Sequence, residues 1–335
     1  MYYLGIDVHK RDSQVAVLDE AGDLVGEQHI DNDQLDELAE AYEGSKAAFE
    51  ASGNYYAVYD TLNEHLDVQV ADPRQTKAIG IAEVKNDRLD AKLLAQLCRA
   101  DMIAESYVPS EGIRELRSLG RGRKRLVEKR TEFKNEVHAL LAKEGISYDW
   151  DPFSQSGRER LGGDDLDLSS VARGLLEGYL AVTDALTEQI HRLEALIEET
   201  AIAREETQLL MTIPGVSFFS SVLIAGEIGE VDRFDRAEEL VSYAGLDPVV
   251  RESGGTRSEG GISKQGSGAL RWILVQCANV AVHTVQDPYL GKFYGRLKRR
   301  KNHQIAIVAT ARKLLVSIYH MLDRKEVYDP PGVNV

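Results

Sequence analysis

The first hundred residues alternate short β-forming runs with helical patterns, and this alternation constrains the fold more than any other feature. Three β-forming runs at 2–8, 13–19 and 24–30 follow one another through short polar turns. Helical spacing at 33–42 and around 56–65 then alternates with buried-type strands at 46–51 and 67–72. A helix over 87–100 closes this part of the chain. The pattern predicts an α/β unit with a mixed sheet covered by helices.

Long helical repeats occupy the middle of the chain. Apolar residues between 112 and 144 recur every three or four positions, with Arg123 and Arg130 at two seam positions. A second repeat steps by three and four for three heptads through Leu176, Tyr179, Thr183, Leu186, Ile190, Leu193 and Ile197. Such a seam indicates a coiled coil, either within one chain or between protomers, and we expect a homo-oligomer, a dimer or a tetramer. The segment 147–165 is predicted to be a loop from its Gly, Ser and Asp content.

The last third of the chain begins near residue 205 and is predicted to be mostly helical. A Pro-Gly-Val turn containing Gly215 separates two helical segments, like a helix-hairpin-helix motif whose backbone N–H groups approach a DNA phosphate. Such turns are common, so the motif alone is weak. Residues 249–268 are rich in glycine and lack periodicity, which predicts a long functional or disordered loop before a helix at 269–285. We therefore predict domains at 1–110, 111–204 and 205–327, with a tail at 328–335.

Composition excludes several classes of protein. The 335 residues carry 40 Lys and Arg against 55 Asp and Glu, a net charge of −15, which argues against a uniformly basic nucleic-acid coat. Cys98 and Cys277 are too few for a disulfide framework or a cysteine-rich metal site. Since no apolar run approaches the roughly 20 residues that span a bilayer and the N-terminus is unlike a signal peptide, we expect a soluble cytoplasmic protein without a membrane partner.

Basic residues nevertheless gather in two stretches. Residues 112–145 hold ten bases against five acids, and residues 291–326 hold ten bases against two acids. Phosphate backbones are the obvious partners of such stretches, although solvated helix faces would give the same composition.

Four acids stand out by their surroundings. Asp7 and Glu50 lie in apolar strands, where an unpaired carboxylate is costly, and Asp87 and Asp90 project from one face at the start of a helix. Carboxylates that converge in this way are suitable ligands for two Mg²⁺ ions, with Mn²⁺ as a possible substitute, acting on a phosphodiester. Each acid also has a structural alternative: Asp87 is a candidate N-cap and Asp90 an ordinary surface acid. For His9, two residues from Asp7, a packing role is favoured over contact with the metal site.

The motifs that contain these acids resemble those of a known family. YLGIDVHK, FEASGNYY, VKNDRLDAKLLA, IPGVSFFSSVLIAGEIG, FDRAEELVSYAGLDP and RESGGTRSEGGISKQGSGALRWIL follow one another over nearly the whole chain. They resemble the DEDD-type insertion-sequence transposases, whose N-terminal domain is similar to the ribonuclease-H-like Holliday-junction resolvase RuvC. The resemblance implies a RuvC-like catalytic domain at 1–110, a coiled-coil region at 111–204 and a C-terminal transposase domain at 205–327.

The resemblance also implies a nucleophile and partners. Ser253 would be the nucleophile, and glycines beside it would let its hydroxyl reach a scissile phosphate. Glu252 and Ser267 depart from the family pattern, which has Gln and Asn there. Some members of the family are RNA-guided, which implies a noncoding guide RNA beside the DNA of the donor ends and the target. Candidate nucleic-acid contacts are basic residues and one turn glycine: Lys85, Arg88, Arg123, Lys124, Arg125, Gly215, Lys264, Arg271, Lys298, Arg299, Arg300 and Lys301.

The sequence therefore predicts a DNA transposase or site-specific recombinase that uses Mg²⁺-assisted transesterification. One alternative is a RuvC-like hydrolytic nuclease that uses the same acids with water. A second is a structure-specific nucleic-acid-binding protein with a degenerate metal site. An actin-like ATPase or sugar kinase shares the Gly-Ile-Asp opening, but the sequence offers no second phosphate loop.

Overall fold

The computed structural model describes residues 1–330 apart from 52, 54, 74–75, 77–85, 164–165 and 254–255, and it does not describe the side chains of 250–260. The chain divides into two compact units, Met1–Val108 and Pro109–Val335, and each is described by itself. Lys85, a candidate nucleic-acid contact, lies outside the described residues.

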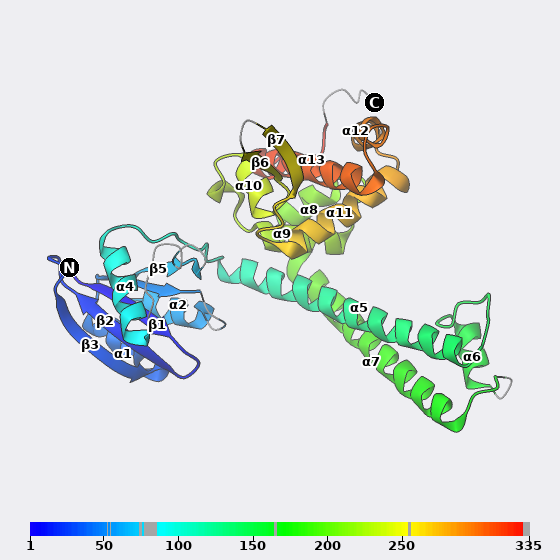
Figure 1. Ribbon diagram of the computed structural model, residues 1–335, viewed down its shortest axis with the longest axis horizontal. Coiled ribbons are helices and arrows are strands. Elements are labelled where there is room, and N and C mark those ends of the chain that lie inside the picture. The colour runs from blue at the N-terminus through cyan, green and yellow to red at the C-terminus, as the bar shows by residue number, and fades with distance from the viewer. Residues whose placement is uncertain are drawn as a thin grey trace. The chain divides into compact units, whose positions relative to one another are not determined.

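A five-stranded mixed sheet forms the centre of the first unit (Figure 1). The strand order is β3-β2-β1-β4-β5, in which β1–β2 and β2–β3 are antiparallel whereas β1–β4 and β4–β5 are parallel. The sequence prediction of a mixed sheet with helices is confirmed. The strands are β1 (Tyr3–Val8), β2 (Asp12–Leu18), β3 (Leu24–Asp31), β4 (Lys46–Glu50) and β5 (Asp67–Ala71).

Helices cover both faces of this sheet. Leu4, Ile6 and Phe49 belong to a buried cluster with residues of α1 (Leu35–Ala41) and α2 (Tyr55–Asn63). Since side chains alternate along a strand, Gly5 and Ala48 lie on the opposite face. That face packs against α4 (Asp87–Arg99). The core of the unit therefore consists of one aliphatic layer and one layer of small residues under α4.

An antiparallel helix pair opens the second unit. α5 (Glu111–Lys143) and α7 (Ser170–Ala201) lie side by side in Figure 1, and Arg123 contacts Glu194 whereas Arg130 contacts Thr187. Every seventh residue of the α7 repeat is buried, whereas the intervening seam residues are half-buried. The predicted seam therefore packs within one chain, and a contact between protomers stays a prediction.

The far end of this pair has its own small core. The predicted loop at 147–165 is partly wrong, because α6 (Gln155–Gly162) lies within it and is capped by the Ser154 hydroxyl. Leu161 of α6 packs with Leu141 of α5 and Leu176 of α7. Glycine and serine content misled the prediction, since here serine caps a helix and Gly157 allows close backbone packing against Asp151. We call residues 111–201 the arm.

The remaining elements form a mostly helical body. α9 is mostly apolar and is buried from Ser220 to Ile228, as expected for a helix at the centre of a core. The elements are α8 (Glu205–Met211), α9 (Phe218–Ile228), α10 (Ala237–Tyr243), β6 (Pro248–Ser253), β7 (Thr256–Ile262), α11 (Gly268–His283), α12 (Pro288–Lys298) and α13 (His303–Arg324).

Helix α13 is the one helix among the described residues that is long and apolar enough to cross a membrane. Its Ile307, Leu314 and Ile318 are buried in the cluster that also contains residues of α9 and α11. We therefore interpret α13 as a core helix.

Candidate active site

Asp7 is positioned by the close packing of α4 on the sheet. It lies on the same face of β1 as Gly5, two residues earlier. A Cβ atom at Gly5 would lie 1.9 Å from the Ala91 carbonyl oxygen of α4 and 2.3 Å from the Ala95 nitrogen. Only glycine therefore lets α4 approach this closely, and the approach brings the start of the helix to the end of β1 that contains Asp7.

Asp87 and Asp90 lie in the first turn of α4, where the positive end of the helix dipole favours carboxylates. The N-cap is Asn86, whose side-chain oxygen accepts a hydrogen bond from the Arg88 nitrogen at 3.2 Å. The interpretation of Asp87 as an N-cap is therefore wrong, since Asn86 already performs that role. Asp87 is exposed and Asp90 is half-buried.

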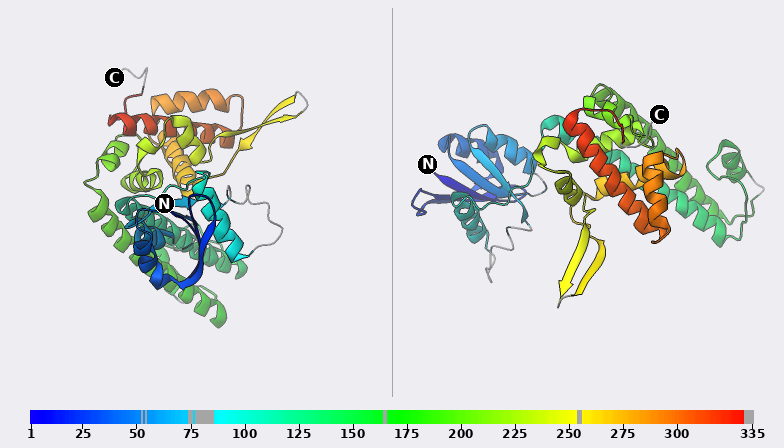
Figure 2. Two further views of the ribbon diagram at one scale, coloured as in Figure 1. Left: turned by 90° about the vertical axis from the view of Figure 1, so that its left-hand side faces the viewer. Right: turned by 90° about the horizontal axis from the view of Figure 1, so that it is seen from above.

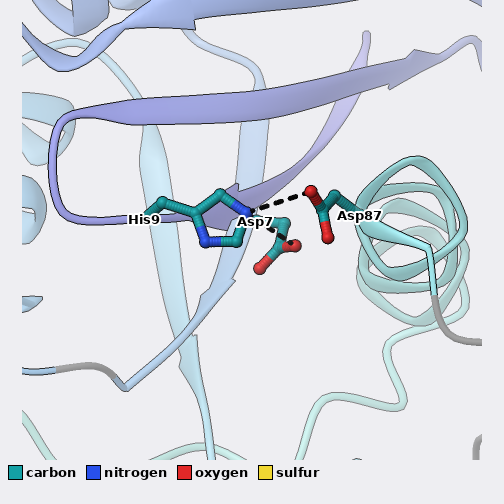
Figure 3. Close-up of side chains that lie close together, drawn as sticks. All are labelled: Asp7, His9 and Asp87. Atoms are coloured by element: carbon teal, nitrogen blue, oxygen red, sulfur yellow. Dashed lines mark ion pairs between the residues drawn. The ribbon is translucent and has the colours of Figure 1, made fainter.

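His9 connects the two elements (Figure 3). Its Nε2 atom lies 3.3 Å from Oδ2 of Asp87 and 3.6 Å from Oδ2 of Asp7, and its side chain is 42% exposed. The favoured packing role for His9 is therefore wrong. The three ligand atoms all lie within 4.8 Å of one another.

Glu50 approaches the same edge from the neighbouring strand. Ile6 pairs with Phe49 in the parallel β1–β4 register, so Asp7 and Glu50 are the next residues on the two strands. Glu50 shares a face with Ala48, which is the face covered by α4. In the described part of the chain, the group at this site whose ligand atoms all lie within 4.8 Å of one another consists of Asp7, His9 and Asp87. Glu50 and Asp90 do not belong to that group.

The donor atoms of this group suit a divalent cation. Carboxylate oxygens are preferred by Mg²⁺ and Mn²⁺, and imidazole nitrogen is an accepted ligand of transition metals. The site is also partly exposed, as a phosphodiester substrate requires, since the Asp7 and Asp87 side chains are 23% and 64% exposed. The residues present therefore fit a catalytic cation.

Ser253 lies in a hairpin and not in an irregular loop. It is the last residue of β6 and pairs with Thr256 of β7 in an antiparallel ladder. The prediction of a long loop over 249–268 is therefore wrong for most of that segment. Composition obscured the hairpin because its polar and glycine residues lack alternation. Figure 2 shows the hairpin extending away from the helices of its own unit.

A side-chain hydrogen bond and a turn that requires glycine hold the end of the hairpin that joins the helical body. The Ser263 hydroxyl donates to Asp247 at 2.7 Å. Gly266 has a φ of 94°, and a Cβ atom there would lie 2.0 Å from the Tyr243 carbonyl oxygen. A glycine is therefore required where the chain passes from β7 to α11.

A buried carboxylate, which the sequence prediction missed, links the segment that follows the hairpin to the arm. Glu227 of α9 is fully buried, and it accepts hydrogen bonds from Arg121 of α5 at 2.5 and 2.8 Å. It also accepts one from the hydroxyl of Ser267, the N-cap of α11, at 2.7 Å. The signal was present in the sequence, because an acid within the apolar run SVLIAGEIG requires a partner.

The Glu227 carboxyl titrates below its usual range. Burial raises its pKa, but the hydrogen bonds and charge of Arg121 and the Ser267 hydroxyl lower it by more. The charge of Arg117 acts in the same direction, and the pKa lies below the ordinary value of 4.5.

Stability should therefore fall when the pH drops below the ordinary value of 4.5. There the unfolded chain binds a proton more readily than folded Glu227, so the free energy of unfolding rises with pH. The contribution of Glu227 is complete above that value and is lost as the pH falls through the lowered pKa. Urea unfolding over an acidic pH series measures the free energy of unfolding at each pH. This free energy should rise less steeply with pH in Glu227→Gln than in the parent protein. Glu188→Gln, at an exposed acid of α7, is the control, and an unchanged slope in Glu227→Gln would contradict the prediction.

Several predicted nucleic-acid contacts have partners within the protein. Arg123 bonds to Glu194 and lies 4.1 Å from the centre of the Phe219 ring. Lys124 pairs with Glu128 and lies over the Trp272 ring. These contacts favour structural roles for both residues, whereas Arg125 is exposed. Arg88 pairs with Glu27 at 2.9 Å and keeps a 70% exposed side chain.

The remaining candidate nucleic-acid contacts also divide into residues with contacts inside the protein and residues that are exposed. Gly215 has a φ of 92° and its Cα faces α11, where a Cβ atom would lie 2.7 Å from the Ala281 nitrogen. This packing explains the glycine, and its contact with phosphate stays a prediction. Arg271 donates to the Ala244 carbonyl at 2.8 Å, which also favours a structural role. The other candidates are exposed, as nucleic-acid contacts require: Lys264, Lys298, Arg299, Arg300 and Lys301.

Comparisons with known proteins identify the class. A family model for DEDD transposases of IS110 elements, described as "Transposase", matches residues 4–144. A second model, described as "Transposase IS116/IS110/IS902 family", matches residues 207–295. The chain is a transposase, an enzyme that cuts and rejoins DNA.

Curated relatives agree over most of the chain. The transposase for insertion sequence element IS1111A of Coxiella burnetii is 28% identical over 97% of this chain and 90% of its own length. The transposase for IS1328 of Yersinia enterocolitica is 25% identical over 93% of both chains. A pilin gene-inverting protein of Moraxella bovis is 31% identical over 44% of this chain and 46% of its own. The chain belongs to the IS116/IS110/IS902 family of transposases.

Proposed function

We propose that this transposase performs metal-assisted transesterification with Asp7, Glu50, Asp87 and Asp90 as metal ligands and Ser253 as the nucleophile. The observation that carries the proposal is the convergence of Asp7 on β1 with Asp87 on α4. The strand order of the sheet, three antiparallel strands followed by two parallel ones, supports a ribonuclease-H-like, RuvC-like fold for this unit.

The acids would hold the cations and so fix the position of the DNA phosphate. When bound, two Mg²⁺ ions, or Mn²⁺ in their place, would neutralise charge on the phosphate oxygens. Asp7 and Glu50 are fixed by adjacent parallel strands, and Asp87 and Asp90 by the first turn of α4. Ligands on a sheet and a helix are held more rigidly than ligands on loops, which favours accurate positioning of the scissile bond.

Ser253 would supply the attacking hydroxyl. Its oxygen forms a bond to phosphorus while the bond from phosphorus to the leaving sugar oxygen breaks, and the serine proton passes to a base. The leaving oxygen takes up a proton and becomes a strand-end hydroxyl. In the second step a strand-end hydroxyl attacks the serine–phosphate ester and releases Ser253. The intermediate conserves the phosphodiester bond energy, which rejoining requires and hydrolysis would discard.

Replacement of Ser253 by alanine tests the nucleophile. Ser253→Ala should form no covalent protein–DNA adduct on a radiolabelled donor end, whereas Ser258→Ala, on the other strand of the hairpin, should form it. If Ser253→Ala still cleaves DNA and neither protein forms an adduct, the hydrolytic RuvC-like alternative is favoured. An adduct in Ser253→Ala contradicts the assignment.

We further propose that a noncoding guide RNA selects the donor ends and the target, and that the enzyme acts in the cytoplasm as a homo-oligomer. Exposed bases at 298–301 support a nucleic-acid partner. The half-buried seam residues Tyr179, Leu186 and Leu193 of α7 leave apolar surface for a second protomer.

Sequencing the RNA that purifies with the protein tests the guide. One discrete noncoding RNA whose loops match both donor and target DNA should be recovered. Recovery of total cellular RNA without enrichment of any one species would contradict the proposed guide RNA. The assignment of the chain as a transposase does not depend on that RNA.

A further inference from the structure

His9 is held in place by its backbone at the start of the β1–β2 turn. Its N–H donates to the Asp12 carbonyl at 2.9 Å, and its carbonyl accepts from the Asn32 amide at 3.0 Å. Asn32 is itself fixed, because the Ser13 hydroxyl donates to its side-chain oxygen at 2.6 Å. These hydrogen bonds hold the backbone of the turn around His9 in place, as a ligand-bearing segment requires.

The side chain of His9 points toward the acids and not into the core. His9 follows the last residue of β1, and its Nε2 atom lies 3.6 Å and 3.3 Å from carboxylate oxygens of Asp7 and Asp87, respectively. Figure 3 shows the imidazole, Asp7 from β1 and Asp87 from α4 turned toward one another. The imidazole therefore lies against both carboxylates where a cation would be held.

The spacing of the three side chains suits one coordination sphere. Adjacent ligands of a six-coordinate ion with bonds of about 2.1 Å lie about 3 Å apart. The distances from His9 Nε2 to the carboxylate oxygens of Asp87 and Asp7 are 3.3 and 3.6 Å. Small side-chain adjustments therefore bring all three atoms onto one ion.

We infer that His9 Nε2 is a third protein ligand of the cation held by Asp7 and Asp87. The inference rests on the proposed function, since it adds a nitrogen donor to the carboxylate site. Imidazole favours transition metals, whereas a site of oxygen ligands alone suits Mg²⁺. The site should therefore bind Mn²⁺ more tightly than Mg²⁺, and removal of the imidazole should reduce that preference.

Pulsed electron paramagnetic resonance of the full chain loaded with Mn²⁺ tests the inference. All samples contain His65→Ala, because Asp36, Glu64 and His65 form another group of ligand atoms within 4.8 Å. Nitrogen hyperfine coupling to Mn²⁺ should be present in this background and absent in His9→Ala. His29→Ala is the matched control, because His29 also pairs with a carboxylate, Asp12 at 3.0 Å, but belongs to neither group.

Calorimetric titration with Mn²⁺ gives the second measurement. His9→Ala should weaken binding by about 10-fold or more, since the loss of even an outer-sphere partner of a ligand costs about 10–100-fold. Tighter binding of Mn²⁺ by His9→Ala would overturn the inference. It would show that the protonated imidazole occupies the carboxylates in place of the metal ion. Nitrogen coupling that persists in His9→Ala, or is absent from the background protein, would also overturn it.

The two proposals fail in different ways. If Mn²⁺ binds without nitrogen coupling and Asp7→Asn weakens binding, the carboxylate site stands and His9 is not a ligand. If Asp7→Asn binds Mn²⁺ as the background protein does, or the background protein binds none, the metal site itself is wrong.

Discussion

Asp7→Asn should abolish strand cleavage while DNA binding and the folded state persist. The neutral amide removes a charged oxygen from the proposed metal site at the end of β1, where His9 and Asp87 converge. A loss of more than about 100-fold in the cleavage rate is expected, because loss of an outer-sphere partner alone costs about 10–100-fold. Gel assays of donor-end cleavage with Mg²⁺, with Mn²⁺ and after chelation measure the effect.

Asp12→Asn is the matched control for Asp7→Asn. Asp12 begins the neighbouring strand and pairs with His29, outside the group of ligand atoms. Its replacement should leave cleavage close to the parent rate. Full cleavage by Asp7→Asn, or cleavage that survives chelation, would refute metal catalysis at this position.

Arg121→Leu should destabilise the protein by about 3 kcal/mol, because removing one partner of a buried ion pair costs about 3–5 kcal/mol. The lower end is expected since the Arg121 side chain is 50% exposed whereas that of Glu227 is buried. Ser267 remains as a hydrogen-bond donor to Glu227. The free energy of unfolding in urea at neutral pH is the measurement.

The double variant Arg121→Leu with Glu227→Leu distinguishes the effect of the unpaired Glu227 charge from a general loss of packing. It removes the buried charge together with its partner and should recover much of the lost stability. Arg125→Leu, at an exposed base one helical turn further along α5, should change the free energy of unfolding by less than about 0.5 kcal/mol. Equal losses in the single and double variants would show that the ion pair is not responsible.

The sheet could be predicted because its strands carry strong local signals. β1, β2 and β4 are short apolar runs between polar turns, and Leu4 and Phe49 are fully buried in the core of the first unit. Asp7 and Glu50 could be proposed as site residues for the same reason, since a carboxylate in an apolar strand is unusual. The pairing order of the strands depended on topology, which local patterns do not encode.

Other features depended on contacts between distant residues. The strands of the hairpin β6–β7, PVVRES and TRSEGGI, lack the alternation of apolar and polar residues that marks a half-buried strand. His9 could not be assigned from sequence, because its role depends on how closely α4 approaches β1. That distance follows from the glycine at position 5, whose contact with Ala91 becomes visible only in three dimensions.

The carboxylate of Glu227 also has a mechanical consequence. It accepts hydrogen bonds from Arg121 of α5 and from the hydroxyl of Ser267. Ser267 follows β7, the strand that pairs with the strand containing Ser253, by a few residues. A displacement of α5 or of the start of α11 would break hydrogen bonds to Glu227. Glu227 therefore couples the position of α5 to the start of α11, which follows the hairpin that contains Ser253, the proposed nucleophile.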